Sequence, residues 1–358
     1  MSRMRPHTVT FTLTAALLAV PGATASKKGG SSTSSSSSSA ATNGYDAVIC
    51  GENGYADGSG LSYSANAWNP DGDGFQCLSI INASSSTSSG FDATWHWPVD
   101  TESVHSYPHV TFSSGDLPES LSNISALRLA ADWAYSPGSI STANDPSRRV
   151  GLDASGLNDV GAIANIAFDM FMDPDEANAT SATAAKFEMM IWIGQIGQPQ
   201  PLGFDSENAT CYTQQLGSFN FTLYTGQNSR GTSVFTWVSP TDQTSFNEDI
   251  APLLQYLWRN QLVSADARLG LIEFGSEAYH SGNNVTFSAT DFTMDVWLGT
   301  PVKFELNPPA DHCKEPESPA GPQGTSTSEK GLGARPLGQP GGALMIVVLL
   351  GSMLAGLV

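Results

Sequence analysis

The chain has 358 residues, 40% of them hydrophobic and 14% charged, and its formal net charge at pH 7 is −19. Nucleic acids and anionic membrane surfaces bind clustered lysine and arginine side chains, so this acidity argues against both as partners. An uncharged ligand remains compatible with it.

The first 25 residues have the pattern of a secretory signal peptide. Arg3 and Arg5 precede an apolar run at residues 8–20, and Ala23 and Ala25 form a small-x-small cleavage pattern. The apolar run has about 13 residues, too few to cross the ~30 Å of hydrocarbon in a bilayer. Residues 26–43 are rich in serine, which predicts a disordered tether.

Residues 44–313 contain many short segments of β-forming residues separated by Gly, Pro, Asn, Asp and Ser. This pattern predicts an all-β sandwich or barrel in one domain. The expected strands lie at 127–133, 163–172, 186–193, 219–225, 232–238, 269–277 and 291–298. Residues 247–260 differ, because their apolar residues recur at helical spacing and predict one helix packed on the sheets.

Alternation along a strand places successive side chains on opposite faces of a sheet. In residues 186–193 one face is apolar and suits the space between two sheets, and the other face carries Glu188, Met190 and Trp192. A carboxylate beside an indole and a thioether is typical of the floor of a sugar-binding cleft. By the same alternation Asp169 faces away from its apolar neighbours, and Glu273 and Glu277 share one side of segment 269–277.

The C-terminal part has a different composition. Residues 314–342 are rich in Pro, Gly and Ser, and residues 343–358 form an apolar tail. Small residues, a polar spacer and a hydrophobic tail are the pattern of a GPI attachment signal, and a short transmembrane helix is the alternative. We therefore expect a secreted, monomeric protein held at the cell surface or cell wall by a lipid anchor.

Sequons and cysteines agree with secretion. Asn-x-Ser/Thr triplets predict N-glycosylation at Asn82, Asn123, Asn178, Asn208, Asn220 and Asn284. The even number of cysteines predicts disulfides, with the pairing left open by spacing alone, among Cys50, Cys77, Cys211 and Cys313. Their spacing does not match a structural zinc site, so no metal is expected.

A set of motifs spread over residues 47–298 occurs in a specific order. Phe-Glu-Met-Met-Ile-Trp at 187–192 is followed by Pro-Leu-Gly at 201–203, and Gly-Ser-Glu-Ala-Tyr at 275–279 supplies a second carboxylate. The other motifs are Asn-Ala-Trp at 66–68, Gln-Cys at 76–77, Trp-His-Trp at 95–97, Val-His-Ser-Tyr-Pro-His at 104–109 and Asn-Ile-Ala-Phe-Asp-Met-Phe at 165–171. Together they resemble glycoside hydrolase family 12, the microbial endoglucanases and xyloglucanases.

The resemblance implies a β-jelly-roll sandwich of two curved antiparallel sheets, with a substrate cleft and one packed helix. It implies a retaining hydrolase that cuts β-1,4-glucosidic bonds inside cellulose-type glucan or xyloglucan, with Glu188 as nucleophile and Glu277 as acid/base. Asp169 is expected to orient or tune Glu188 through a shared hydrogen bond. The expected substrate-binding residues are Trp68, Asn66, Trp97, Met190, Trp192 and Tyr107.

The resemblance also implies a disulfide between Cys50 and Cys77, which leaves Cys211 to pair with Cys313. A carboxylate nucleophile and proton transfer suffice for this chemistry, so no cofactor is expected. The chain departs from the family pattern at His105 and His109, which stand where a lysine and an asparagine are usual.

Three other functions use a similar sandwich. A lectin or other non-catalytic carbohydrate-binding protein would keep the aromatic residues but would not need both carboxylates. Family 11 xylanases share the fold and the carboxylate pair, but their motifs resemble this chain less well. A cell-wall glucan transglycosylase would form the same covalent intermediate and pass it to a sugar hydroxyl, and the sequence does not separate this activity from hydrolysis.

Overall fold

The computed structural model describes residues 43–84, 89–145, 149–204 and 212–308. The expected signal peptide, the serine-rich tether up to residue 42, the 314–342 linker and the 343–358 tail lie outside these residues, as do Asn208, Cys211 and Cys313. The expectations for those segments therefore stay predictions. Among the described residues, no helix is long and apolar enough to cross a membrane.

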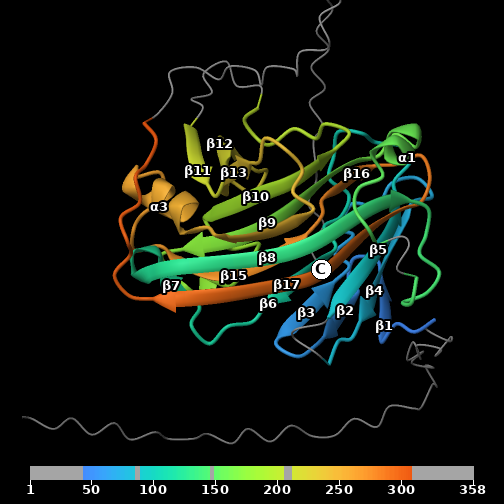
Figure 1. Ribbon diagram of the computed structural model, residues 1–358, viewed down its shortest axis with the longest axis horizontal. Coiled ribbons are helices and arrows are strands. Elements are labelled where there is room, and N and C mark those ends of the chain that lie inside the picture. The colour runs from blue at the N-terminus through green and yellow to red at the C-terminus, as the bar shows by residue number, and fades with distance from the viewer. Residues whose placement is uncertain (1–42, 85–88, 146–148, 205–211, 309–358) are drawn as a thin grey trace, which may run out of the picture. The chain divides into compact units, whose positions relative to one another are not determined.

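Two β-sheets form the framework of the described chain (Figure 1). The six-stranded sheet has, in order, β1 (Ala47–Cys50), β4 (Phe75–Ile81), β5 (Gly90–His96), β17 (Val285–Leu298), β8 (Ile124–Pro137) and β14 (Ser245–Asp249). The eleven-stranded sheet has, in order, β11 (Tyr212–Leu216), β12 (Phe219–Gln227), β13 (Ser233–Val238), β10 (Phe187–Ile196), β9 (Ile163–Asp173), β15 (Arg268–Gly275), β6 (His109–Phe112), β3 (Leu61–Ser64) and β2 (Tyr55–Asp57). Two short strands join it at the side, β16 (Ala278–His280) on β9 and β7 (Glu119–Ser120) on β15. The predicted all-β sandwich is confirmed, and its sheets do not close into a barrel.

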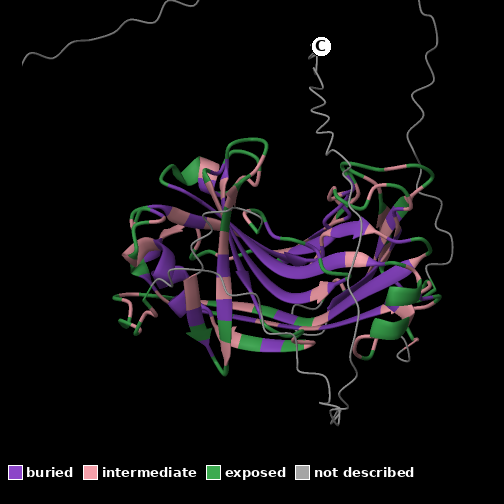
Figure 2. Ribbon diagram, turned by 90° about the horizontal axis from the view of Figure 1, so that it is seen from above, coloured by how far each residue is buried: buried purple, intermediate pink, exposed green. Residues whose placement is uncertain are grey.

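The hydrophobic core fills the space between the sheets. Met189, Ile191 and Ile193 of β10 are fully buried in it, together with Ile166 and Phe168 of β9. Burying one such side chain stabilises the fold by about 1.5–3 kcal/mol. Figure 2 shows the buried residues along the strands and the exposed residues mostly in the connecting loops. The expected alternation is confirmed, so the intervening residues of β10 and β9 remain to build the opposite face of the sheet.

One pair of strands departs from the expected antiparallel arrangement. β10 and β13 run parallel, with Glu188 opposite Val234 and Met190 opposite Thr236. Parallel neighbours need a long crossover connection. Here β11 and β12 lie between β10 and β13 in the chain, which lets β13 return beside β10 in the same direction.

Residues 247–260 form two elements instead of the single expected helix. Asn247 and Glu248 belong to β14, which pairs with β8, and helix α3 spans only Ala251–Arg259. Asp249 ends the strand, because its Oδ1 accepts hydrogen bonds from the backbone N–H groups of Leu127 and Ala251, each at 3.0 Å. The structure also has three short elements that the sequence does not indicate. They are the helices α1 (Ala154–Asp159) and α2 (Glu176–Ala179) and a 3₁₀ turn (Leu121–Asn123).

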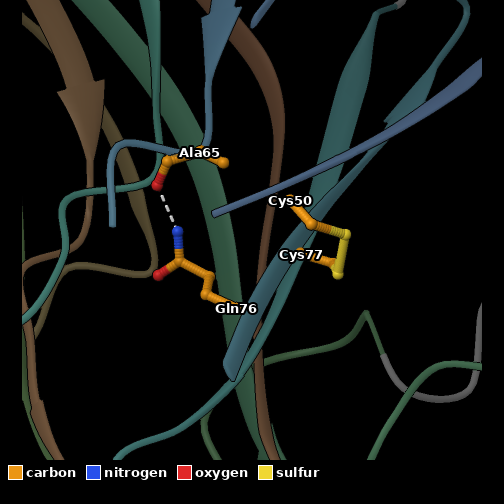
Figure 3. The surroundings of a disulfide bond; sticks show 4 residues. All are labelled: Cys50, Ala65, Gln76 and Cys77. Carbon is orange, nitrogen blue, oxygen red and sulfur yellow. Dashed lines mark hydrogen bonds between the residues drawn. A yellow bond between two sulfur atoms is a disulfide. The ribbon is translucent and has the colours of Figure 1, made fainter. Parts of the chain in front are cut away.

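A disulfide joins Cys50 of β1 to Cys77 of β4 (Figure 3), so the pairing implied by the resemblance is confirmed. The two residues lie directly opposite each other in the antiparallel register. Beside the disulfide, the buried Gln76 amide donates a hydrogen bond to the Ala65 carbonyl. The pair of contacts fixes the segment that leads into Asn66 against the six-stranded sheet.

Replacing both Cys50 and Cys77 with serine is expected to lower the free energy of unfolding by about 3.5 kcal/mol. The physical reason is that the bond closes a loop with a sequence separation of 27 and so restricts the unfolded chain. Urea unfolding followed by tryptophan fluorescence measures the difference from the parent protein. A loss below about 1 kcal/mol would contradict this account of the bond.

Five of the six expected glycosylation sites lie in the described residues. Asn82, Asn123 and Asn220 are exposed, and Asn178 and Asn284 are half-buried. The Asn284 amide donates a hydrogen bond to Ser139 Oγ at 3.0 Å, so a glycan there would displace that contact. Glycosylation stays a prediction at all six positions.

Candidate active site

The face of the eleven-stranded sheet that points away from the core carries the candidate site. The strand register places Met190 of β10, Asp169 of β9 and Glu273 of β15 in one row across three neighbouring strands. Glu188 and Trp192 lie two residues to either side of Met190 and therefore share this face. These side chains line a cleft of about 770 Å³, which Glu277 also lines.

Five of the six expected substrate-binding residues line this cleft. They are Trp68, Asn66, Tyr107, Met190 and Trp192. Trp68 is 44% exposed, as the platform for a sugar ring has to be. Met190 and Trp192 form a small apolar cluster with Ala167 and Val238, separate from the main core. The structure thus brings these residues together, and their contact with substrate stays a prediction.

Trp97 corrects the expectation for the sixth residue. Its side chain is 1% exposed and belongs to the main core, and it does not line the cleft. Its Nε1 donates a hydrogen bond to Ser106 Oγ at 3.1 Å, and its ring lies 5.6 Å from that of His105. Trp97 follows β5 of the six-stranded sheet, which is not the sheet that carries the cleft.

The surroundings of Glu188 shift its pKa in opposite directions. Burial, with a smaller effect of the Glu273 charge, outweighs the lowering by the Arg230 charge and the Asn228 hydrogen bond, and the net pKa of Glu188 is raised to about 7. Asn228 Nδ2 lies 3.4 Å from Glu188 Oε2. Asn228 and Arg230 both come from the turn between β12 and β13, and both line the cleft together with Glu188.

Glu277 lies just after β15 and is fixed by Asn165 of β9. The Glu277 backbone N–H donates to Asn165 Oδ1 at 2.9 Å, the Asn165 backbone N–H donates to the Glu277 carbonyl at 3.1 Å, and the Asn165 amide donates to Glu277 Oε2. The Tyr279 hydroxyl donates to the same Oε2 at 3.3 Å. Burial raises the pKa of Glu277 to about 7, and the negative charge of Glu188 acts in the same direction.

The two carboxyls both have a pKa raised to about 7, but the charges around them differ. Glu188 has a cation nearby, and its own negative charge helps to keep the proton on Glu277. An ionised carboxylate and a protonated carboxyl in one cleft are the two groups that cleavage of a glycosidic bond requires. The expected roles, Glu188 as nucleophile and Glu277 as acid/base, fit this arrangement.

Asp169 does not make the shared hydrogen bond with Glu188 that the resemblance implies. Among the described residues no hydrogen bond joins the two side chains, and the buried Asp169 Oδ1 has no hydrogen-bond partner. The register explains this, because Asp169 lies opposite Met190 and Glu188 lies opposite Phe171, so the carboxyls are diagonal neighbours. Burial, and then the charges of Glu188, Glu273 and Glu277, raise the pKa of Asp169 well above its ordinary value.

Several residues of the site had no role in the sequence analysis. They are Asn165, Tyr279, Asn228, Arg230 and Glu273. Asn165 and Glu273 could have been found, because strand alternation puts each on the same face as the expected carboxylates. Asn228 and Arg230 lie in a turn, where no periodic pattern indicates which way a side chain points.

A β-sandwich cleft that holds two carboxyls with raised pKa values fits a glycoside hydrolase, whose reaction uses one carboxylate and one protonated carboxyl. Known sequences place the chain within this class. A family model for glycosyl hydrolase family 12 matches residues 152–297, which include Glu188 and Glu277. The chain is 25% identical over 251 residues to the xyloglucan-specific endo-beta-1,4-glucanase A of Aspergillus aculeatus, a match that covers 69% of this chain and 90% of that enzyme. The enzyme of the same name from Emericella nidulans is 25% identical over 252 residues, covering 70% of this chain and 91% of that enzyme.

Solved structures show the same fold. The catalytic domain of Humicola grisea Cel12A, in complex with a thio cellotetraose, superposes with a TM-score of 0.56 at 25% identity over 70% of this chain and 99% of that one. The Trichoderma harzianum endoglucanase 3 superposes with a TM-score of 0.56 at 22% identity, over 70% of this chain and 97% of that one. The family model, the curated relatives and the solved structures together support glycoside hydrolase family 12 for this chain.

The pH dependence of kcat/KM is expected to reflect the two carboxyls. The pKa of Glu277 is raised to about 7, so activity should fall about tenfold per pH unit above that point as the acid loses its proton. On the acid side activity should fall as Glu188 takes up a proton. Initial rates on a soluble glucan between pH 4 and pH 9, with stability checked at each pH, measure both limbs; activity that stays constant up to pH 9 would contradict the role of Glu277 as acid.

Proposed function

We propose that this enzyme hydrolyses internal β-1,4-glucosidic bonds of a neutral glucan, of the cellulose or xyloglucan type, with retention of configuration. The observation that carries the proposal is the placing of Glu188 beside Arg230 and of Glu277 beside Asn165 and Tyr279 in one cleft. The activities named for the Aspergillus aculeatus and Emericella nidulans relatives support this substrate class.

The reaction proceeds in two displacements. In the first, the Glu188 carboxylate attacks the anomeric carbon while Glu277 gives its proton to the departing glycosidic oxygen. In the second, Glu277 accepts a proton from water as that water attacks the glycosyl–enzyme ester and releases Glu188. Asn165 and Tyr279 hold the Glu277 carboxyl in place for both proton transfers.

The extent of the groove supports action inside a polymer chain. A second hollow of about 590 Å³ adjoins the cleft and shares Glu102, Gln200, Leu202 and Tyr279 with it as lining residues. A substrate chain that crosses Tyr279 would therefore contact protein on both sides of the carboxyl pair. This arrangement suits endo-cleavage more than removal of single sugars from an end.

The test measures reducing ends released from xyloglucan, mixed-linkage β-glucan, hydroxyethyl cellulose and xylan by the disulfide-intact protein. Release of reducing ends from a glucan supports the proposal if the first product is the β-anomer, which then mutarotates. Release from xylan alone would reject it in favour of a xylanase. A parallel assay contains an acceptor oligosaccharide. Products longer than this acceptor, with little net release of reducing ends, would show that the enzyme is a transglycosylase and not a hydrolase.

The charges of the cleft predict discrimination against anionic substrates. Among the described lining residues Arg230 is the one basic residue, while the acidic residues are Glu52, Glu102, Asp169, Glu188, Glu273 and Glu277, of which Asp169 and Glu277 contribute less negative charge because their pKa values are raised. Each carboxymethyl group on a glucan would meet this negative field, at a cost of about 1 kcal/mol or more per close pair. We expect kcat/KM at low salt to be about tenfold lower on carboxymethyl cellulose than on hydroxyethyl cellulose of equal substitution.

Salt separates this electrostatic effect from a steric one. At about 1 M salt the Debye length falls to ~3 Å, so the ratio between the two substrates should approach one. A ratio that does not change with salt would assign the discrimination to the size of the substituent. Equal rates at low salt would show that the negative field of the cleft does not reach the substituents.

We further propose that the enzyme acts outside the cell and is attached to the surface by a lipid. The signal-like N-terminus, the sequons and the Cys50–Cys77 disulfide support secretion, since disulfides persist in oxidising compartments. Release of the enzyme from producing cells by phosphatidylinositol-specific phospholipase C tests the anchor, and retention after that treatment would reject it. Light scattering of the released protein tests whether it is a monomer.

A further inference from the structure

A buried histidine–glutamate pair lies at the floor of the cleft. His109 Nε2 of β6 is 3.3 Å from Glu273 Oε1 of β15, and the two side chains are 7% and 9% exposed. Glu273 lines the cleft, and His109 lies behind it and does not. The Thr111 hydroxyl donates a further hydrogen bond to Glu273 Oε1 at 3.4 Å.

The contacts of His109 fit a doubly protonated ring. Its Nδ1 lies 2.7 Å from the Tyr107 carbonyl oxygen and its Nε2 faces the Glu273 carboxylate, so both nitrogens face acceptors. A neutral imidazole carries one N–H only and would leave one of these contacts without a proton. The Tyr107 ring stacks on the imidazole at 5.1 Å, which suits a cation beside an aromatic face. An imidazolium next to an ionised Glu273 satisfies every contact.

The groups around the pair connect it to the catalytic carboxyls. Glu273 lies opposite Asp169 in the β15–β9 register, and its negative charge acts to raise the pKa of both Asp169 and Glu188. From β3, the residue opposite His109 is the uncharged Ser64. Burial lowers the pKa of His109, but Glu273 and the Tyr107 carbonyl more than offset this, and the net pKa lies above the ordinary 6.5.

We propose that His109 and Glu273 form a buried ion pair whose balance of charge sets how readily Glu188 ionises. The imidazolium offsets the charge of Glu273 and so limits how strongly that charge opposes ionisation of Glu188. The proposal rests on the proposed function, since it assigns Glu188 as the group that must ionise. His109 and Glu273 act here through Glu188 and are positioning residues.

Two single variants are expected to move the acid limb of kcat/KM in opposite directions. His109→Asn removes the cation and leaves Glu273 unbalanced, so the acid limb should move up by about one pH unit, which lowers kcat/KM about tenfold on that limb. Glu273→Gln removes the negative charge, so the acid limb should move to lower pH. The double variant His109→Asn/Glu273→Gln replaces the ion pair by two neutral amides and should return the limb close to that of the parent.

The control is His96→Asn, a half-buried histidine of β5 on the six-stranded sheet, which should leave the acid limb in place. Thermal unfolding of all variants checks that each is folded. Folded single variants whose acid limbs match the parent, or that shift in the same direction, would overturn the proposal. A double variant whose acid limb lies at the same pH as that of His109→Asn would overturn it as well.

A direct readout on the parent protein needs no variant and no activity. The ¹⁵N shifts of the His109 ring, followed by NMR between pH 5 and pH 8, report whether both nitrogens carry protons. An imidazolium that persists above pH 6.5 is expected, and a ring that is neutral at pH 6 would overturn the ion pair. If the parent cleaves no glucan, the proposed function fails, while this titration still decides whether the pair is charged.

Discussion

Glu188→Gln is expected to lower kcat/KM on the preferred glucan by about 10⁴- to 10⁶-fold, the range that loss of a covalent nucleophile or its partners costs other hydrolases. Glutamine keeps the shape of the side chain and its contact with Asn228, but it has no charge with which to attack the anomeric carbon. The substitution removes a carboxyl group whose ionised form is disfavoured by burial, so the folded protein should be no less stable. The measurement is the initial rate of reducing-end release, with unfolding followed in parallel.

The matched control for this variant is Glu305→Gln, an exposed carboxylate that does not line the cleft. Its activity should equal that of the parent. A residual activity above about one hundredth in folded Glu188→Gln would contradict the nucleophile assignment.

The stereochemistry of a rescued product tests the same role more sharply. In Glu188→Ala, azide can enter the space left by the carboxylate and attack an activated dinitrophenyl β-glycoside from the Glu188 side. The product should then be an α-glycosyl azide, because one displacement inverts the anomeric carbon. A β-glycosyl azide from this variant would place the nucleophile elsewhere.

Glu277→Gln is expected to lower kcat/KM on a glucan by about 10²- to 10⁴-fold, the usual contribution of a general acid. The loss should nearly vanish for formation of the glycosyl–enzyme from a dinitrophenyl β-glycoside, since that leaving group departs without a proton. The alkaline limb near pH 7 should also disappear from kcat/KM with this substrate, because the titrating acid is gone. Pre-steady-state release of dinitrophenol measures this step.

Azide again distinguishes the two carboxyls. In Glu277→Ala it should accelerate the second step by attacking the glycosyl–enzyme from the side opposite Glu188, which gives a β-glycosyl azide. Equal losses on natural and activated substrates would show that Glu277 does not supply the proton. A loss of kcat/KM that is confined to natural substrates also separates the role of Glu277 as acid from a general fall in stability. Glu305→Gln again serves as the control.

The two faces of β10 show how much local sequence can predict. Alternation alone assigns Met189, Ile191 and Ile193 to the core and Glu188, Met190 and Trp192 to the cleft, and the structure has both sets where the pattern puts them. The pattern works here because a strand buried on one face needs a uniform apolar row, and a shift of one residue would expose all of it. The same argument holds for Asp169 of β9.

Other features depended on contacts that no local pattern encodes. Asn165 and Glu277 are 112 positions apart, and only the pairing of β9 with the segment after β15 brings them into hydrogen-bond contact. The turn that places Arg230 near Glu188 and the β6–β15 pairing that joins His109 to Glu273 are equally non-local. Trp97 was assigned to the cleft from its motif, but its position after β5 turns it into the core.

The sequence by itself determined the sandwich, the cleft face and the two carboxylates, because each follows from a period of two residues or from a short motif. The tertiary structure decided which groups surround those carboxylates, and with that how far the pKa of each is raised. The reason is physical: a pKa depends on burial and on charges a few ångströms away, and in a sheet built from distant segments those neighbours are set by strand pairing rather than by position along the chain.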